Sequence, residues 1–344
     1  MVHARLEHAE GDPPPHIGER QRHAPMIVVG LGGDMHRAGG GERKLEPLLG
    51  AGLAGAAGDR DHHRALDAGP RRAAEIADAK AEIFESLERG GAAILNRDNP
   101  YYDRLRRHAL EHEARVIGFG AAKGAEARLL EVDLRADGSD VKADILGETI
   151  SYRLGAPGLH LVQNSLAVLA AVKLARANLA SAARALSRWS AQTGRGERVV
   201  IDTGAGRLAL IDETYNANPA SMRAALATLA LTPREEYPRR VAVLGDMLEL
   251  GGQGPKLHLE LAEFIDAAGV DVVFACGELM VGLYDSLPPS RQGGYAKTAE
   301  QLAPLLAKGV GAGDVVMIKG SFGSRMAPLV EALQRHFDTA GAQA

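Results

Sequence analysis

Alternation of strand-like and helix-like apolar segments after Ala77 is the feature that most constrains the fold of this chain. Strands are expected at 92–95, 115–119, 241–244, 272–275 and 315–318. Helices are expected at 77–87, 101–113, 160–177, 181–189 and 219–231. Repeated alternation of this kind predicts an α/β fold in which helices cover a mostly parallel sheet.

Two stretches depart from that alternation. Turn residues at Asp137-Gly138 and Gly147-Glu148 separate three alternating segments, which predicts antiparallel hairpins over 127–134, 141–146 and 149–154. Strands at 199–202 and 208–212 are expected to pair after a linker at Gly194–Gly196. Because 344 residues exceed what one core usually holds, two domains with part of a third are expected.

The composition changes abruptly near residue 76. All 14 aromatic residues lie at or after Phe84, whereas seven of the 12 histidines precede residue 64. Before that point only Met26–Val29 and Leu45–Leu53 offer short apolar stretches, and neither has sustained periodicity. Residues 1–76 are therefore not expected to form much core, and a boundary is expected near residue 76.

Charge and hydropathy exclude several broad classes. With 40 Lys and Arg against 44 Asp and Glu, a net charge of −4 argues against a general nucleic-acid binder. The longest strongly apolar stretch, Leu166–Val172, is far shorter than the roughly 20 residues of a membrane span. The first residues carry charges and prolines where a signal peptide has an apolar run, and Cys276 is alone, so a cytoplasmic location is expected. Cys276 is expected to pack in the core rather than act as a nucleophile.

Polar residues gather directly after the strand at 208–212. Glu213, Tyr215 and Asn216 together offer carboxylate, hydroxyl and amide groups suited to a sugar or a phosphate. An ordinary strand, turn and capped helix accounts for Asn218 as N-cap and Pro219 as first helical residue, but not for that cluster. Since ligands bind beyond the carboxyl ends of strands in open α/β sheets, these residues are candidates for a site.

Two other strand ends are also polar. Asp246 follows one of them, and Lys319-Gly320-Ser321 follows the other. Lys319 could place an ammonium group against an anion together with a backbone N–H and the Ser321 hydroxyl, although a single lysine is more often a snorkelling surface residue. Convergence of three such strand ends favours a site.

Other residues carry weaker signals when taken alone. His160 and Asn164 stand four apart at the start of a helix and share a face, but a histidine there is more often a cap or a surface residue. Lys80 resembles a solvated helix position. No Gly-Lys dipeptide occurs, so no phosphate loop of the G-x-x-x-x-G-K-[ST] type is present in these 344 residues. A dinucleotide oxidoreductase built on Gly30–Gly33 is disfavoured, because the third glycine of that fingerprint is missing.

Taken together, several motifs closely resemble the Mur ligases. The most specific are Tyr-Asn-Ala-Asn-Pro at 215–219 and Gly-Asp-Met-Leu-Glu-Leu-Gly at 245–251. The others lie at 78–84, 96–99, 158–164, 194–195 and 319–321. The resemblance implies a remnant of a P-loop-type central, ATP-binding domain over 77–193. It also implies a Rossmann-like C-terminal domain over 194–336, followed by a tail over 337–344.

What the resemblance implies is ATP-dependent amide formation during peptidoglycan synthesis, and hence a role in cell-wall biogenesis, cell shape and cell division. A UDP-muramoyl-tripeptide carboxylate becomes an acyl phosphate that the amine of D-alanyl-D-alanine attacks, with ATP and Mg²⁺ required and a monomeric enzyme expected. Lys80 matches the catalytic lysine that the family carbamylates as a magnesium ligand. The nucleotide-binding matches are His160, Asn164, Arg195 and Glu213, and the substrate-binding matches are Tyr215, Asn216, Asn218, Lys319 and Ser321.

Residues 1–76 depart from the family, which carries a UDP-binding domain and a phosphate loop before the Lys80 motif. This segment is expected to be either poorly ordered or the product of a shifted reading frame. Two interpretations follow: an active ligase, or a catalytically inactive remnant that at most binds nucleotide or substrate.

Overall fold

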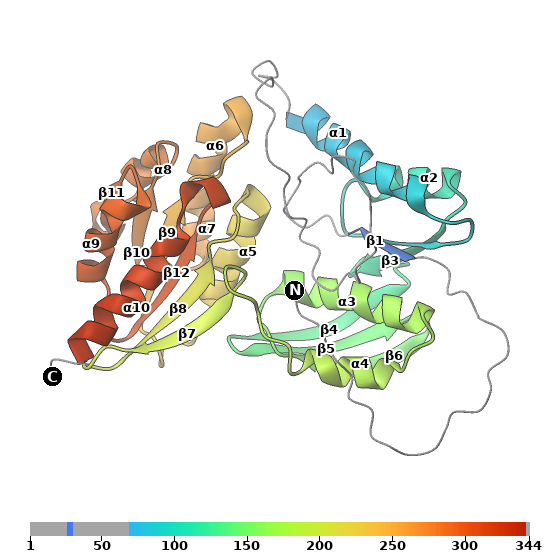
Figure 1. The fold of residues 1–344 in the computed structure, drawn as a ribbon, viewed down its shortest axis with the longest axis horizontal. Helices are drawn as coiled ribbons and strands as arrows, with labels where there is room; N and C mark the ends of the chain where they lie inside the picture. The colour runs from blue at the N-terminus through green and yellow to red at the C-terminus, as the bar shows by residue number, and fades with distance from the viewer. Residues whose placement is uncertain (1–25, 30–68, 342–344) are drawn as a thin grey trace.

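The computed structural model describes residues 26–29 and 69–341, which form two α/β halves, each built on a six-stranded sheet (Figure 1). Strands β1 to β6 make the first sheet in sequence order, and the second has the order β11-β10-β9-β12-β8-β7. The α/β class expected from the sequence is confirmed. None of the helices in the described part of the chain is long and apolar enough to cross a membrane.

The first sheet is mixed. Its parallel part runs from β1 (Met26–Val29) through β2 (Ala92–Asn96) and β3 (Arg115–Gly120) to β4 (Ala127–Arg135). Strands β5 (Gly138–Ile145) and β6 (Glu148–Leu154) then pair antiparallel, as the turn residues predicted. The helices of this half are α1 (Gly69–Ala81), the 3₁₀ turn η1 (Glu82–Ser86), α2 (Tyr102–Glu111), α3 (Leu159–Leu174) and α4 (Leu179–Leu186).

Helices cover both faces of this sheet. In β2, Ala93 and Leu95 point into the core formed with η1 and α2, whereas Ile94 points into the core formed with α3 and α4. Alternate residues of a strand face opposite sides, so a strand buried on both faces must be apolar throughout. The continuous apolar run at 92–95 therefore specified a central strand.

The second sheet comprises β7 (Glu197–Asp202), β8 (Arg207–Glu213), β9 (Arg239–Gly245), β10 (Val272–Cys276), β11 (Gln292–Ala296) and β12 (Asp314–Lys319). Only β7 is antiparallel to its neighbour. The helices of this half are α5 (Pro219–Ala230), α6 (Gly254–Leu259), α7 (Leu261–Ala267), α8 (Met280–Ser286), α9 (Ala299–Gly309) and α10 (Ala327–Gly341). Short 3₁₀ turns lie at η2 (Gly251–Gln253), η3 (Pro289–Arg291) and η4 (Phe322–Ser324).

The strand order reverses direction once in this half. From β8 through β9 and β10 to β11 the connecting helices α5, α7 and α8 pack on one face. The chain then returns to place β12 between β8 and β9, with α9 and α10 on the other face. A change of face on reversal is what right-handed crossovers require. As a result the carboxyl ends of β8 and β12 are neighbours, with Glu213 opposite Lys319 in the register.

Several boundaries differ from those expected. The boundary near residue 76 falls inside α1, and β1 adds a strand from a segment that was not expected to contribute to a core. The helices expected at 160–177 and 181–189 end earlier, at Leu174 and Leu186. The expected tail over 337–344 begins within α10, where Phe337 packs in the core.

Strand β11 was not anticipated, because Gly293 and Gly294 interrupt any apolar pattern there. A Cβ atom at Gly293 would lie 2.5 Å from the Val272 side chain, so close packing excludes a larger residue. The glycine cluster Gly30–Gly33 and most of the segment 1–76 lie outside the described residues.

Candidate functional site

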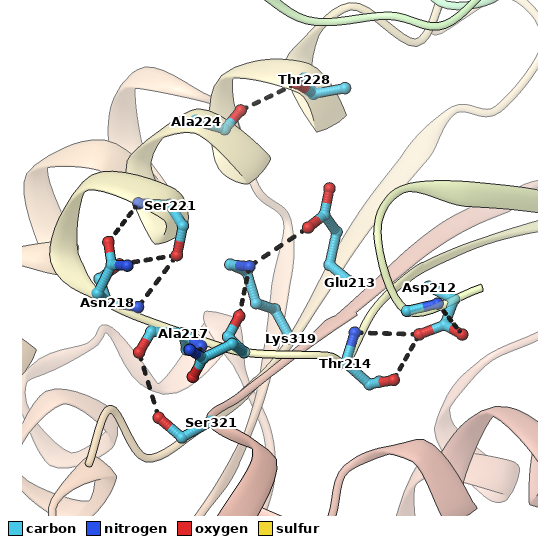
Figure 2. A network of polar contacts seen from close by, with 12 residues as sticks. Asp212, Glu213, Thr214, Ala217, Asn218, Ser221, Ala224, Thr228, Lys319 and Ser321 are labelled. Carbon is cyan, nitrogen blue, oxygen red and sulfur yellow. Dashed lines mark hydrogen bonds and ion pairs between the residues drawn. The ribbon is translucent and has the colours of Figure 1, made fainter. Parts of the chain in front are cut away.

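An ion pair joins the carboxyl ends of β8 and β12 (Figure 2). Lys319 Nζ lies 3.3 Å from Glu213 Oε2 and donates a hydrogen bond of 2.8 Å to the carbonyl oxygen of Asn216. The Lys319 side chain is only 3% exposed, which rules out the snorkelling alternative. The expectation that Glu213 and Lys319 meet on one rim of the sheet is confirmed.

Ser321 connects three loops on the same rim. Its hydroxyl donates to the carbonyl oxygen of Ala217 at 3.2 Å and accepts the N–H of Leu248 at 2.9 Å. Asn216 Oδ1 accepts the N–H of Ala217. The loop after β8 is therefore held against the loops after β9 and β12.

Asn218 is the N-cap of α5, as the structural interpretation of the sequence predicts. Its side-chain oxygen accepts the N–H of Ser221 at 2.9 Å, and the Ser221 hydroxyl accepts the N–H of Asn218 at 3.0 Å, which completes a capping box at the start of α5. Within the described part of the chain, the buried Asn218 Nδ2 has no hydrogen-bond partner. The capping box uses the Asn218 side-chain oxygen and backbone N–H, so Nδ2 is the Asn218 donor that takes no part in capping.

Asp246 organises the Gly-Asp-Met motif. Its carboxylate accepts the backbone N–H groups of Leu279 and Met280, and its carbonyl oxygen accepts the N–H of Ser321 and the hydroxyl of Ser324. A Cβ at Gly277 would overlap the carboxylate, which explains the glycine there. The polar residue after β9 thus shapes the rim rather than lying free for a ligand.

The linker between the two halves is attached to the end of β8. Gly194 donates its N–H to Asp212 Oδ2 at 2.9 Å, and Gly196 donates its N–H to the Asp212 carbonyl oxygen at 2.7 Å. Between these glycines, the Arg195 guanidinium lies 3.7 Å from the centre of the Tyr215 ring, a cation–π contact. Arg195 is thereby brought next to the polar loop after β8.

A pocket lies between the two halves of the chain. From the first half it is lined by Pro157, His160 and Leu161, and from the second half by Arg195, Arg198, Glu213, Thr228 and Thr232, among others. Three of the four nucleotide-binding candidates, His160, Arg195 and Glu213, therefore meet at one place. Asn164 is exposed one turn further along α3 and does not line the pocket.

The electrostatics of the pocket favour a neutral imidazole. Burial lowers the pKa of His160, and the Lys319 ammonium lowers the same pKa further, while the Glu213 carboxylate acts in the opposite direction. A neutral imidazole beside Arg195 and Arg198 offers both a hydrogen-bond donor and an acceptor next to two cations.

Lys80 lies apart from this pocket, half-buried in the last turn of α1. The acidic residue of its motif, Asp78, binds Arg104 of α2 through two hydrogen bonds of 2.5 and 2.6 Å, which joins the two helices. Among the described residues there is no group of three or more His, Cys, Asp and Glu side chains arranged to hold a metal ion. The described residues therefore gather no His, Cys, Asp and Glu ligand set around Lys80.

Sequence reasoning missed Asp212, which is buried and accepts hydrogen bonds from both the linker and Thr214. Its position directly before Glu213, at the end of an otherwise apolar strand, was the available signal. Cys276 is buried in the core as expected. Its burial, and to a smaller extent the nearby Asp246 carboxylate, raises the pKa of its thiol to about 11.

Comparison with protein families identifies both halves. The Mur ligase middle domain matches residues 65–172, and the glutamate ligase domain of Mur ligases matches residues 194–322. The chain belongs to the Mur ligase family. The first match begins before Gly69, where α1 starts, and the second begins at the linker.

Among related Mur ligases, the UDP-N-acetylmuramoyl-tripeptide–D-alanyl-D-alanine ligase of Rickettsia prowazekii is 27% identical over 76% of this chain and 57% of its own length. The enzyme of the same name from Escherichia coli is 29% identical over 76% of this chain and 56% of its own length. The chain thus spans little more than half the length of these relatives.

Among solved structures, MurF ligase from Thermotoga maritima in complex with ADP has a TM-score of 0.65 at 20% identity, over 77% of this chain and 58% of that one. At that identity the likeness establishes the fold alone.

Proposed function

We propose that this Mur ligase chain binds ATP in the pocket between its two halves and serves in joining D-alanyl-D-alanine to UDP-N-acetylmuramoyl-tripeptide. The observation that carries the proposal is that His160, Arg195 and Glu213, from opposite halves, line one pocket. The names of the two relatives above support the reaction. A cytoplasmic location, a monomeric state and a role in cell-wall biogenesis, cell shape and cell division belong to the same proposal.

The side chains that line the pocket suit a nucleotide, but the pocket itself, at about 20 Å³, has room for little more than one water molecule, so the proposal requires the two halves to move apart when ATP binds. Arg195 and Arg198 supply guanidinium groups, which bind phosphate oxygens in a bidentate manner. The Glu213 carboxylate can accept hydrogen bonds from ribose hydroxyls, and the neutral His160 imidazole can bind a base edge. ATP, as a substrate, supplies the phosphoryl group that converts the tripeptide carboxylate to an acyl phosphate, which the dipeptide amine then attacks.

The rim after β8 and β12 would hold the reacting peptide groups. Lys319 presents a buried ammonium group there, and charge neutralisation is the main requirement of phosphoryl and acyl transfer. The Asn216 carbonyl oxygen accepts a hydrogen bond from that ammonium group, and Tyr215, Asn218 and Ser321 lie on the same rim. A carbamylated Lys80 remains part of the proposal, but no step is assigned to magnesium, since the described residues do not gather a ligand set.

A second candidate function follows from one feature of the sequence. The 344 residues contain no Gly-Lys dipeptide, so they lack the lysine and hydroxyl with which a phosphate loop cradles nucleotide phosphates. We propose that the 344-residue chain alone binds nucleotide without completing the reaction. Loss of a single donor at comparable electrostatic sites already reduces rates on the order of a hundredfold to a thousandfold.

Both proposals can be tested with the purified 344-residue protein. ADP formation from ATP is measured with UDP-N-acetylmuramoyl-tripeptide and D-alanyl-D-alanine present, and ADP binding is measured by calorimetry. Binding without ADP formation is the result that the second proposal predicts. Turnover that depends on both peptide substrates would instead establish an active ligase, and absence of both binding and turnover would contradict the nucleotide site.

A further inference from the structure

Asp212 is a buried carboxylate whose described hydrogen-bond donors are all uncharged. Its residue is 4% exposed, at the penultimate position of β8. One carboxylate oxygen accepts the Gly194 N–H at 2.9 Å, and the other accepts the Thr214 N–H at 3.0 Å and the Thr214 hydroxyl at 2.6 Å (Figure 2). Burying a carboxylate costs free energy unless donors compensate it, and these three hydrogen bonds provide that compensation.

These contacts connect two segments that carry nucleotide-site candidates. The linker bears Arg195, and the end of β8 bears Glu213 and Tyr215. Besides the carboxylate contact, the Tyr215 N–H donates to the Gly194 carbonyl oxygen at 3.0 Å. The Asp212 side chain, through its contacts with Gly194 and Thr214, is thus a polar clamp that adds to two backbone hydrogen bonds in holding the linker beside the loop after β8.

Glycine is required at both ends of the clamp. Gly194 and Gly196 have φ values of 77° and 97°, a region that other residues rarely adopt. A Cβ at Gly194 would lie 3.2 Å from Tyr215 Cβ, and one at Gly196 would lie 3.2 Å from Glu213 Oε1. The linker backbone therefore approaches the strand end too closely to accommodate a larger residue at either position without a shift.

We propose that Asp212 is a positioning residue for nucleotide binding: it holds the linker so that Arg195 stacks on Tyr215 and faces the pocket beside Glu213. The inference rests on the proposed function, because it holds that the clamp serves nucleotide binding. Asp212 does not line the pocket, so it acts through Arg195.

The first test measures the clamp without nucleotide, by amide hydrogen exchange on the full chain. Asp212→Ala removes both halves of the clamp, whereas the matched control Thr214→Val removes only the hydroxyl contact and leaves the Gly194 contact. Exchange of the Gly194 amide should rise roughly tenfold or more in Asp212→Ala, as expected when a hydrogen bond to a charged acceptor is lost, whereas the Gly196 amide keeps the Asp212 backbone carbonyl oxygen as its partner. Exchange of the Gly194 amide should change little in Thr214→Val, and Asp212→Asn, which keeps one acceptor oxygen, should restore part of the protection.

Peptides from β10 serve as the internal reference for global stability. Unchanged exchange at Gly194, or an equal rise in β10, would overturn the positioning role.

The second test is a double-mutant cycle on ADP affinity with Arg195→Met. If Asp212 acts through Arg195, Asp212→Asn should weaken ADP binding in the parent chain but not in the Arg195→Met background. A purely structural Asp212 would give additive losses, which would overturn the proposal. If the parent chain binds no ADP, the proposed function fails, while the exchange measurement still decides whether Asp212 holds the linker.

Discussion

Removing the buried ammonium of Lys319 should destabilise the second half of the chain. In the Lys319→Met variant the side chain keeps its approximate length, but Glu213 loses an ion-pair partner 3.3 Å away and the Asn216 carbonyl oxygen loses a donor 2.8 Å away. At 3.3 Å the Coulomb attraction is about 5 kcal/mol for an effective dielectric constant of about 20, part of which offsets desolvation. Breaking one side of a buried pair typically costs 3–5 kcal/mol. Because Glu213 is 15% exposed, we expect a loss of about 3 kcal/mol, at the lower end of that range.

Urea unfolding followed by circular dichroism measures this loss, with the transitions of the two halves fitted separately. Lys308→Met, which removes an exposed lysine from α9, is the control and should change the free energy of unfolding by less than about 0.5 kcal/mol. Adding Glu213→Gln to Lys319→Met removes the stranded carboxylate, so the double variant should be more stable than Lys319→Met alone. A loss below about 1 kcal/mol in Lys319→Met, or a double variant less stable still, would refute the assignment of a buried, mutually dependent pair.

Three further predictions follow from burial and exposure. The pKa of His160 is lowered in the folded protein, so the contribution of this residue to the free energy of unfolding is fully present above the unfolded-state pKa of about 6.5. That contribution declines as the pH falls below this value, because the unfolded state then binds a proton that the folded state resists. In urea titrations His160→Gln should show a weaker decline between pH 7.5 and 5.5, and an unchanged decline would contradict the burial of the imidazole. Cys276 should not react with a thiol reagent at pH 8 in the folded protein but should react fully in denaturant, since its pKa is raised to about 11; rapid labelling of the native chain would show that the thiol is accessible. Between α4 and β7, limited trypsinolysis should cut after Arg188, in the exposed stretch before the linker, sooner than after Arg195 in the clamped Gly194–Gly196 segment, and mass spectrometry of the early fragments tests this order.

The elements that the sequence predicted best were those buried on both faces. The runs at 92–95 and 315–318 are apolar without interruption, which leaves a central strand as the natural interpretation. Strand β11 escaped prediction because its glycines are required by Val272 and Phe274 of the neighbouring strand β10, a contact that no local pattern reports.

The candidate site was only partly predictable. The meeting of Glu213 and Lys319 could be foreseen because both follow strands of a parallel sheet, whose carboxyl ends share an edge. The approach of His160 to that pair depends on how the two halves pack, which sequence spacing does not encode. Asp212 was overlooked because its partner Gly194 is distant in sequence and contributes only a backbone N–H.

ADP affinity of the full 344-residue chain is the most direct test of the interdomain nucleotide site. Calorimetry is performed on the parent chain, on Arg195→Met and on the control Arg188→Met, which removes an exposed arginine outside the pocket. We predict measurable ADP binding that Arg195→Met weakens about tenfold or more, as expected for loss of a charge-assisted contact to phosphate, and that Arg188→Met leaves within about twofold of the parent. Equal affinities for all three proteins would contradict a nucleotide site at Arg195.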